Sequence, residues 1–252
     1  MLRLALVVLA TVVTACAPTS VQVKRPADAT ADAAVTMMWT HEIERVARDG
    51  DWLLTRSYAA VGDVIALGTA GEDLSHASIY DATRGTVIEA IGSGVREIPL
   101  QQLVARNHYV IVVRPSRMTA ADQTEAVARA RTKLGASFDY TGVFGFDARD
   151  KWFCSELVAW ASQTEARNHV HETVMTPPDL MKYGEVIYWS GKRDDAQVLA
   201  LAKARYAAVI VAPRLVSAAA KPGYEVATLS ASSISAGPVA ARAATAAAIA
   251  MR

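Results

Sequence analysis

Two residues of this sequence have the chemistry and the setting for nucleophilic catalysis. Cys154 opens an apolar segment that is typical of a helix start, and His76 lies in a short segment typical of a strand. A thiol at a helix N-terminus is favoured as thiolate, because the unpaired N–H groups and the helix dipole stabilise its negative charge. An imidazole can take and return a proton. The pair therefore predicts acyl transfer through a thioester.

Glu89 is the candidate for a third member of this site. It stands in an otherwise apolar strand, over residues 87–91, where a buried carboxylate needs a partner. If residues 81–84 form a four-residue hairpin loop, Tyr80 pairs with Gly85. In that register His76 lies directly opposite Glu89, so the carboxylate can fix one imidazole nitrogen and leave the other for the thiol.

The remaining pattern predicts the elements that must hold these residues. Strands are expected over residues 51–56, 63–67, 76–80, 86–91, 108–114 and 186–189, and helices over 35–48, from 120 to about 134, 154–163 and 194–211. This order predicts an α+β fold, a small antiparallel sheet with helices packed on one side.

The composition places this domain at residues 34–213. Lysine and arginine number 26 against 25 aspartate and glutamate residues, so no charge excess favours a nucleic-acid partner. Residues 214–252 are rich in alanine and serine and have few large apolar side chains, so we expect a mostly disordered tail. The proposed chemistry needs no cofactor. No metal is expected either, because Arg45 stands where a zinc-protease helix beginning at His41 would need its second histidine.

The N-terminus has the features of an export signal over residues 1–15. Arg3 precedes an apolar run, residues 4–13, that is too short to span a bilayer. The run ends before Cys16 in a sequence that resembles a bacterial lipoprotein cleavage site. That resemblance implies lipidation of Cys16 and a tether over residues 16–33, and Ala17 in place of aspartate implies the outer membrane, facing the periplasm. The alternative is an ordinary signal peptide that is cut after Ala15.

Lipidation would settle the use of the two cysteines. With Cys16 acylated, Cys154 has no disulfide partner in an oxidising compartment. An unpaired thiol there is a liability unless it is used or well buried.

The order and content of several segments resemble the permuted papain-like amidases of the YaeF/YiiX group, circularly permuted relatives of the NlpC-type cell-wall hydrolases. The matching segments are residues 50–56, 87–90, 112–115 and 134–140, together with Ser75-His76-Ala77-Ser78-Ile79-Tyr80 and Phe153-Cys154-Ser155-Glu156-Leu157-Val158. In papain itself the cysteine helix precedes the histidine strand, whereas here His76 comes before Cys154. The reversed order is that of the permuted group.

The resemblance implies a permuted papain-like (NlpC-type) fold and a role for each site residue. Cys154 would be the nucleophile, His76 the base and Glu89 the residue that orients the histidine. The oxyanion would be held by the backbone N–H of Cys154 and by a tyrosine just upstream, for which Tyr140 is the candidate.

Three functions remain open from the sequence. The first is an exported, lipid-anchored thiol hydrolase that cleaves an amide bond in cell-wall peptide. The second is a lipid acyl hydrolase or acyltransferase, which a groove lined by Trp52, Phe144, Phe146 and Trp152 would favour. The third is a non-catalytic lipoprotein that binds the cell envelope, although such a protein has no need of an intact cysteine, histidine and glutamate set.

Overall fold

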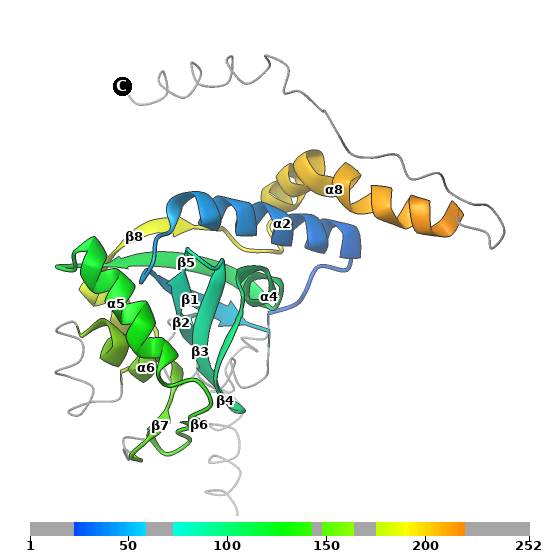
Figure 1. Cartoon of the computed structure of the whole chain (residues 1–252). Coiled ribbons are helices and arrows are strands. Elements are labelled where there is room, and N and C mark those ends of the chain that lie inside the picture. The colour runs from blue at the N-terminus through cyan, green and yellow to red at the C-terminus, as the bar shows by residue number, and fades with distance from the viewer. Residues whose placement is uncertain (1–22, 59–72, 143–147, 164–174, 220–252) are drawn as a thin grey trace, which may run out of the picture. The chain divides into compact units, whose positions relative to one another are not determined.

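A six-stranded antiparallel sheet organises the protein in our computed structural model, which describes residues 23–58, 73–142, 148–163 and 175–219 (Figure 1). The strand order is β4-β3-β2-β1-β5-β8. The strands are β1 (Trp52–Ser57), β2 (His76–Asp81), β3 (Thr86–Ile91), β4 (Gly94–Pro99), β5 (Asn107–Pro115) and β8 (Gly184–Trp189). The α+β class predicted from the sequence is confirmed.

Helices and two short strands complete the architecture. They are α2 (Ala29–Val46), α4 (Leu100–Ala105), α5 (Ala120–Arg131), α6 (Cys154–Ser162), the 3₁₀ helix η2 (Pro178–Tyr183), α8 (Ala196–Ala219) and the parallel pair β6 (Ser137–Phe138) and β7 (Lys151–Trp152). Helix α5 begins with a capping box between Thr119 and Asp122, as the sequence indicates. In the part of the chain that the structure describes, no helix is both long and apolar enough to cross a membrane.

The prediction that the helices cover one side of the sheet is wrong, because they cover both. Helices α5 and α6 lie on one face and α2 and α4 on the other (Figure 1). The reason is visible in β1, where Trp52, Leu53 and Leu54 are consecutive and all fully buried. Successive strand residues point to opposite faces, so a continuous apolar run needs cover on both sides.

Two predicted boundaries are also wrong. Helix α2 begins at Ala29, after an N-cap at Asp28 whose side chain accepts the N–H groups of Thr30 and Ala31, so residues 29–33 are helical rather than tether. Helix α8 continues to Ala219, and residues 214–219 are therefore helical rather than disordered. The alanine content of both stretches favours helix. The predicted strand over residues 63–67, the N-terminal signal and the tail beyond residue 219 lie outside the described residues.

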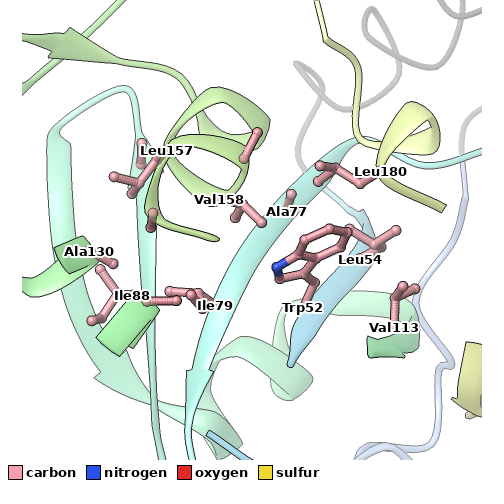
Figure 2. Close-up of a cluster of buried hydrophobic side chains, with 14 of the residues drawn as sticks. Trp52, Leu54, Ala77, Ile79, Ile88, Val113, Ala130, Leu157, Val158 and Leu180 are labelled. Atoms are coloured by element: carbon pink, nitrogen blue, oxygen red, sulfur yellow. The ribbon is translucent and has the colours of Figure 1, made fainter. Parts of the chain in front are cut away.

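The core under α6 fixes where that helix begins. Figure 2 shows Leu157 and Val158 on α6 and Ala77, Ile79 and Ile88 on the sheet in one buried apolar cluster. At the other end of the helix, the indole N–H of Trp52 on β1 donates a buried hydrogen bond of 2.8 Å to the hydroxyl of Ser162. The helix is thus held on the sheet at several points along its length.

We expect Ser162→Ala to lower the free energy of unfolding by ~1–3 kcal/mol, because it leaves the indole N–H of Trp52 buried without an acceptor. Urea unfolding followed by fluorescence measures the change. Ser116→Ala, at an exposed serine, is the matched control and should change the same quantity by less than ~0.5 kcal/mol. Equal stability of both variants would show that the Trp52 bond contributes nothing.

Candidate active site

Cys154 is the first residue of α6, and its surroundings favour negative charge on the sulfur. The preceding residue, Phe153, is extended, and its N–H donates to the carboxylate of Glu156 at 3.2 Å, which fixes the chain's entry into the helix. The sulfur accepts hydrogen bonds from the backbone N–H groups of Ser155 and Ala77. Cys154 is 8% exposed.

The N–H of Ala77 is free for the sulfur because the sheet opens at this point. Strands β2 and β3 pair from Asp81 opposite Thr86 to Ile79 opposite Ile88, and the pairing ends there. On its other side β2 stays paired with β1 as far as His76. The N–H of Tyr80 points to β1, so that of Ala77, three residues away, points to the β3 side. Cys154, the first residue of α6, takes this N–H in place of a carbonyl on β3.

His76 stands at this opening and contacts both other members of the predicted site. Its Nε2 atom lies 2.7 Å from Oε2 of Glu89, and its ring also forms a hydrogen bond with the thiol of Cys154. Since Glu89 occupies Nε2, the thiol is left with Nδ1. The structure therefore joins sulfur, imidazole and carboxylate in one continuous chain of hydrogen bonds.

The predicted register between His76 and Glu89 is wrong by two residues. Because Asp81 pairs with Thr86, the hairpin loop is 82–85 rather than 81–84, and the same register would place Ser78 opposite Glu89. A shift of one residue would have turned Glu89 to the other face, but a shift of two keeps it on the face of His76. Glu89 is thus a diagonal neighbour, still within reach of a long side chain.

Two arginines that the sequence analysis missed also bind Glu89. The carboxylate is fully buried, and it accepts a hydrogen bond at Oε1 from Nε of Arg96, at 2.9 Å, and one at Oε2 from Nη2 of Arg106. Arg96 lies directly opposite Glu89 on β4. The two-residue turn Gly92-Ser93 gives that register, so the sequence carried a signal for Arg96. Arg106 follows α4, which was not predicted.

The charges of the site favour a thiolate and an imidazolium. Burial alone would lower the pKa of His76, but its hydrogen bonds to Cys154 and Glu89 and their charges raise it to about 9. Burial alone would raise the pKa of Cys154, but the hydrogen bond and charge of His76 and the two backbone N–H groups lower it. Burial alone would likewise raise the pKa of Glu89, yet His76 and the two arginines lower it to about 2.

Tyr140 does not contact these three residues through its hydroxyl. The hydroxyl donates instead to the backbone carbonyl of Gly92 at 2.7 Å, in the turn between β3 and β4. Its ring packs edge-on against Phe138, and the residue is 64% exposed. The fifth predicted residue, Cys16, lies outside the described residues.

Papain-like cysteine hydrolases set a thiol on a helix against an imidazole on a strand, and the fold and this site belong to that class. More narrowly, the chain belongs to the permuted papain-like amidase enzymes, the YaeF/YiiX, C92 family, whose family model matches residues 46–211. The matched segment includes Cys154, His76, Glu89 and Tyr140. Comparison with curated proteins gave no match. The family and a cysteine-hydrolase activity, both predicted from the sequence, are confirmed.

We expect the thiol of Cys154 to react rapidly with iodoacetamide even at pH 6, because a protonated His76 stabilises its thiolate. In His76→Ala that support is absent and the thiol pKa rises. The rate should then fall roughly 100-fold between pH 8 and pH 6, as for a thiol with a pKa of ~8.5 or above. Both chains carry Cys16→Ser, so that one thiol remains.

His41→Ala is the control for loss of a histidine, because His41 is exposed. Its alkylation profile between pH 5 and pH 9 should match that of the parent chain. A parent chain that loses reactivity on acidification as steeply as His76→Ala would contradict a stabilised thiolate.

Proposed function

We propose that this protein is an exported, lipid-anchored thiol hydrolase that cleaves an amide bond in cell-wall peptide, with Cys154, His76 and Glu89 as its catalytic triad. The observation that carries the proposal is the hydrogen-bonded chain from the thiol through the imidazole to the buried carboxylate. The amidase family supports the type of bond. The lipoprotein-like sequence around Cys16 supports the anchor, and an outer-membrane position facing the periplasm brings the site near the cell wall.

The mechanism begins with attack of the Cys154 thiolate on the carbonyl carbon of the scissile amide. The carbonyl oxygen becomes an oxyanion, which the backbone N–H of Cys154 at the start of α6 stabilises. The imidazolium of His76 then gives its proton to the leaving nitrogen, the C–N bond breaks, and an amine departs from a thioester. The neutral His76 next takes a proton from water, whose oxygen attacks the thioester carbon; the C–S bond breaks, the acyl group leaves as a carboxylic acid, and the thiolate and imidazolium are restored.

Glu89 keeps His76 in the orientation that this cycle needs. Its bond to Nε2 leaves Nδ1 directed at the sulfur, and its negative charge stabilises the imidazolium that persists between turnovers. Tyr140 enters the proposal as a second oxyanion donor. For that role its hydroxyl must release the carbonyl of Gly92 and donate its hydrogen bond to the substrate oxygen instead.

The alternative function as a lipid acyl hydrolase or acyltransferase has no specific support in the described structure. A groove lined by Trp52, Phe144, Phe146 and Trp152 would favour it, but the side chain of Trp52 is fully buried beneath α6. Phe144 and Phe146 lie outside the described residues. Amide cleavage therefore remains our proposal, and phospholipid serves as the competing substrate in its test.

The test is incubation of the purified protein with peptidoglycan fragments and, separately, with phospholipid vesicles. We expect new amino groups from the peptide fragments and no released fatty acid. Cys154→Ser should lower the rate by ~10³-fold or more, because an alkoxide is far harder to form than this thiolate. Circular dichroism checks that the variant folds. Fatty-acid release that depends on Cys154, without amide cleavage, would replace the proposal with the lipid alternative.

We expect Tyr140→Phe to lower kcat by ~10²–10³-fold with little change in KM, as for loss of one oxyanion donor. Steady-state rates on the peptidoglycan fragments that the protein cleaves measure both constants. An unchanged kcat would restrict Tyr140 to bracing the turn at Gly92, and would leave oxyanion stabilisation to backbone N–H groups.

A further inference from the structure

The carboxylate of Glu89 binds two arginines in addition to His76. The chemistry of the proposed triad requires only the bond to His76. Glu89 accepts hydrogen bonds from three residues. They are His76 on β2, Arg96 on β4 and Arg106, which directly follows α4. The carboxylate is fully buried, whereas the arginine side chains are 36% and 31% exposed. Water therefore screens the charge of the Glu89 carboxylate poorly.

The two arginines bind different oxygens, and this difference gives them different roles. Arg96 binds Oε1, the oxygen that His76 does not use. Arg106 binds Oε2, and Nε2 of His76 binds the same atom. Arg106 and His76 therefore compete for the lone pairs and the charge of one oxygen.

We propose that Arg106 is a positioning residue that limits how strongly Glu89 holds the proton of His76. The inference rests on the proposed function, in which His76 must give that proton to the leaving nitrogen. A carboxylate that served the imidazolium alone would hold the proton more tightly and make the imidazolium a weaker acid. With Arg106 on the shared oxygen, the carboxylate still orients the ring but attracts its proton less.

The charges around His76 are consistent with an action that passes through Glu89. The ring contacts Glu89 from β3 and Cys154 from α6, and these two residues supply the charges that raise its pKa. Arg96 and Arg106 reach the ring by way of the carboxylate, which their own charge and hydrogen bonds help to keep ionised. Removal of Arg106 should therefore affect His76 more while residue 89 carries a charge than when it is neutral.

The experiment is an NMR titration of the Cε1–H resonance of His76, in the full chain with Cys16→Ser. The resonance is assigned by its absence in His76→Ala. We expect Arg106→Gln to raise the pKa of His76 by ~0.5–1 unit, since the carboxylate then acts on the imidazolium alone. Arg96→Gln should give a smaller rise. The matched control is Arg84→Gln, at an arginine that is 59% exposed and ion-paired to Asp81 and Glu97, and it should give none.

The same substitution in a Glu89→Gln background separates the proposed route from a direct charge effect. We expect Arg106→Gln to raise the pKa of His76 clearly less there than with Glu89 intact, because only the direct repulsion between the two cations is then lost. A shift of equal size in both backgrounds would overturn the proposal, and so would no shift with Glu89 intact. If Arg106→Gln fails to fold, Arg106→Lys replaces it. Lysine keeps the charge but loses the guanidinium, so it should raise the pKa of His76 by less than half of the ~0.5–1 unit expected for Arg106→Gln. No rise in that variant would also overturn the proposal.

The titration needs no substrate, so its outcome is independent of the amidase test. A rise in pKa without any amide cleavage would leave the role of Arg106 intact and sink the proposed function. Amide cleavage that depends on Cys154, without a rise in the pKa of His76, would support the proposed function and overturn the role of Arg106. Where both hold, the alkaline limb of the pH profile of kcat/KM, which reports the free enzyme, should move upward in Arg106→Gln by the same amount as the NMR value.

Discussion

The site depends on the point at which β2 and β3 stop pairing, after Ile79 and Ile88. If the ladder continued, β3 would take up the N–H of Ala77, and the sulfur of Cys154 would lose one of the two backbone donors that it has. The end of the ladder and the packing of α6 on the sheet therefore together decide where the thiol lies.

Burial of Glu89 would be costly without the partners that surround it. An isolated carboxylate in an apolar interior takes up a proton rather than stay charged. Here three cationic donors hold the pKa of Glu89 at about 2, so it remains ionised at neutral pH. The thiolate of Cys154 supplies a second negative charge beside His76. The site is thus a small network of opposite charges, in which loss of one member alters the protonation of its neighbours.

The sequence was sufficient to find Cys154, His76 and Glu89 because each is marked by its local pattern. The thiol opens a helix, the imidazole lies on a strand, and the carboxylate interrupts an apolar run. Their pairing was found despite a register error of two residues, since a shift of two preserves the face of a strand. Chance therefore helped, because an error of one residue would have turned Glu89 away from His76.

Most of the features that escaped prediction depend on contacts between distant segments, whereas Arg96 lies across a short hairpin from Glu89. Arg96 and Arg106 lie on and beside β4 and α4, two short elements with no strong periodic pattern. Placement of helices on both faces of the sheet follows from the consecutive buried residues of β1, whose second face must also be covered. The end of pairing between β2 and β3 has no local signature, because it reflects where α6 inserts.

The permuted order of the chain is compatible with this site because of how the site is built. The start of α6 must meet the opening between β2 and β3, and the helix is held there by apolar packing and by the bond between Trp52 and Ser162. None of these contacts is local in sequence. The strand that carries His76 can therefore precede or follow the helix that carries Cys154, provided that the same two surfaces pack together. The chemistry is fixed by that packing, whereas the order of the elements along the chain decides only which loops connect them.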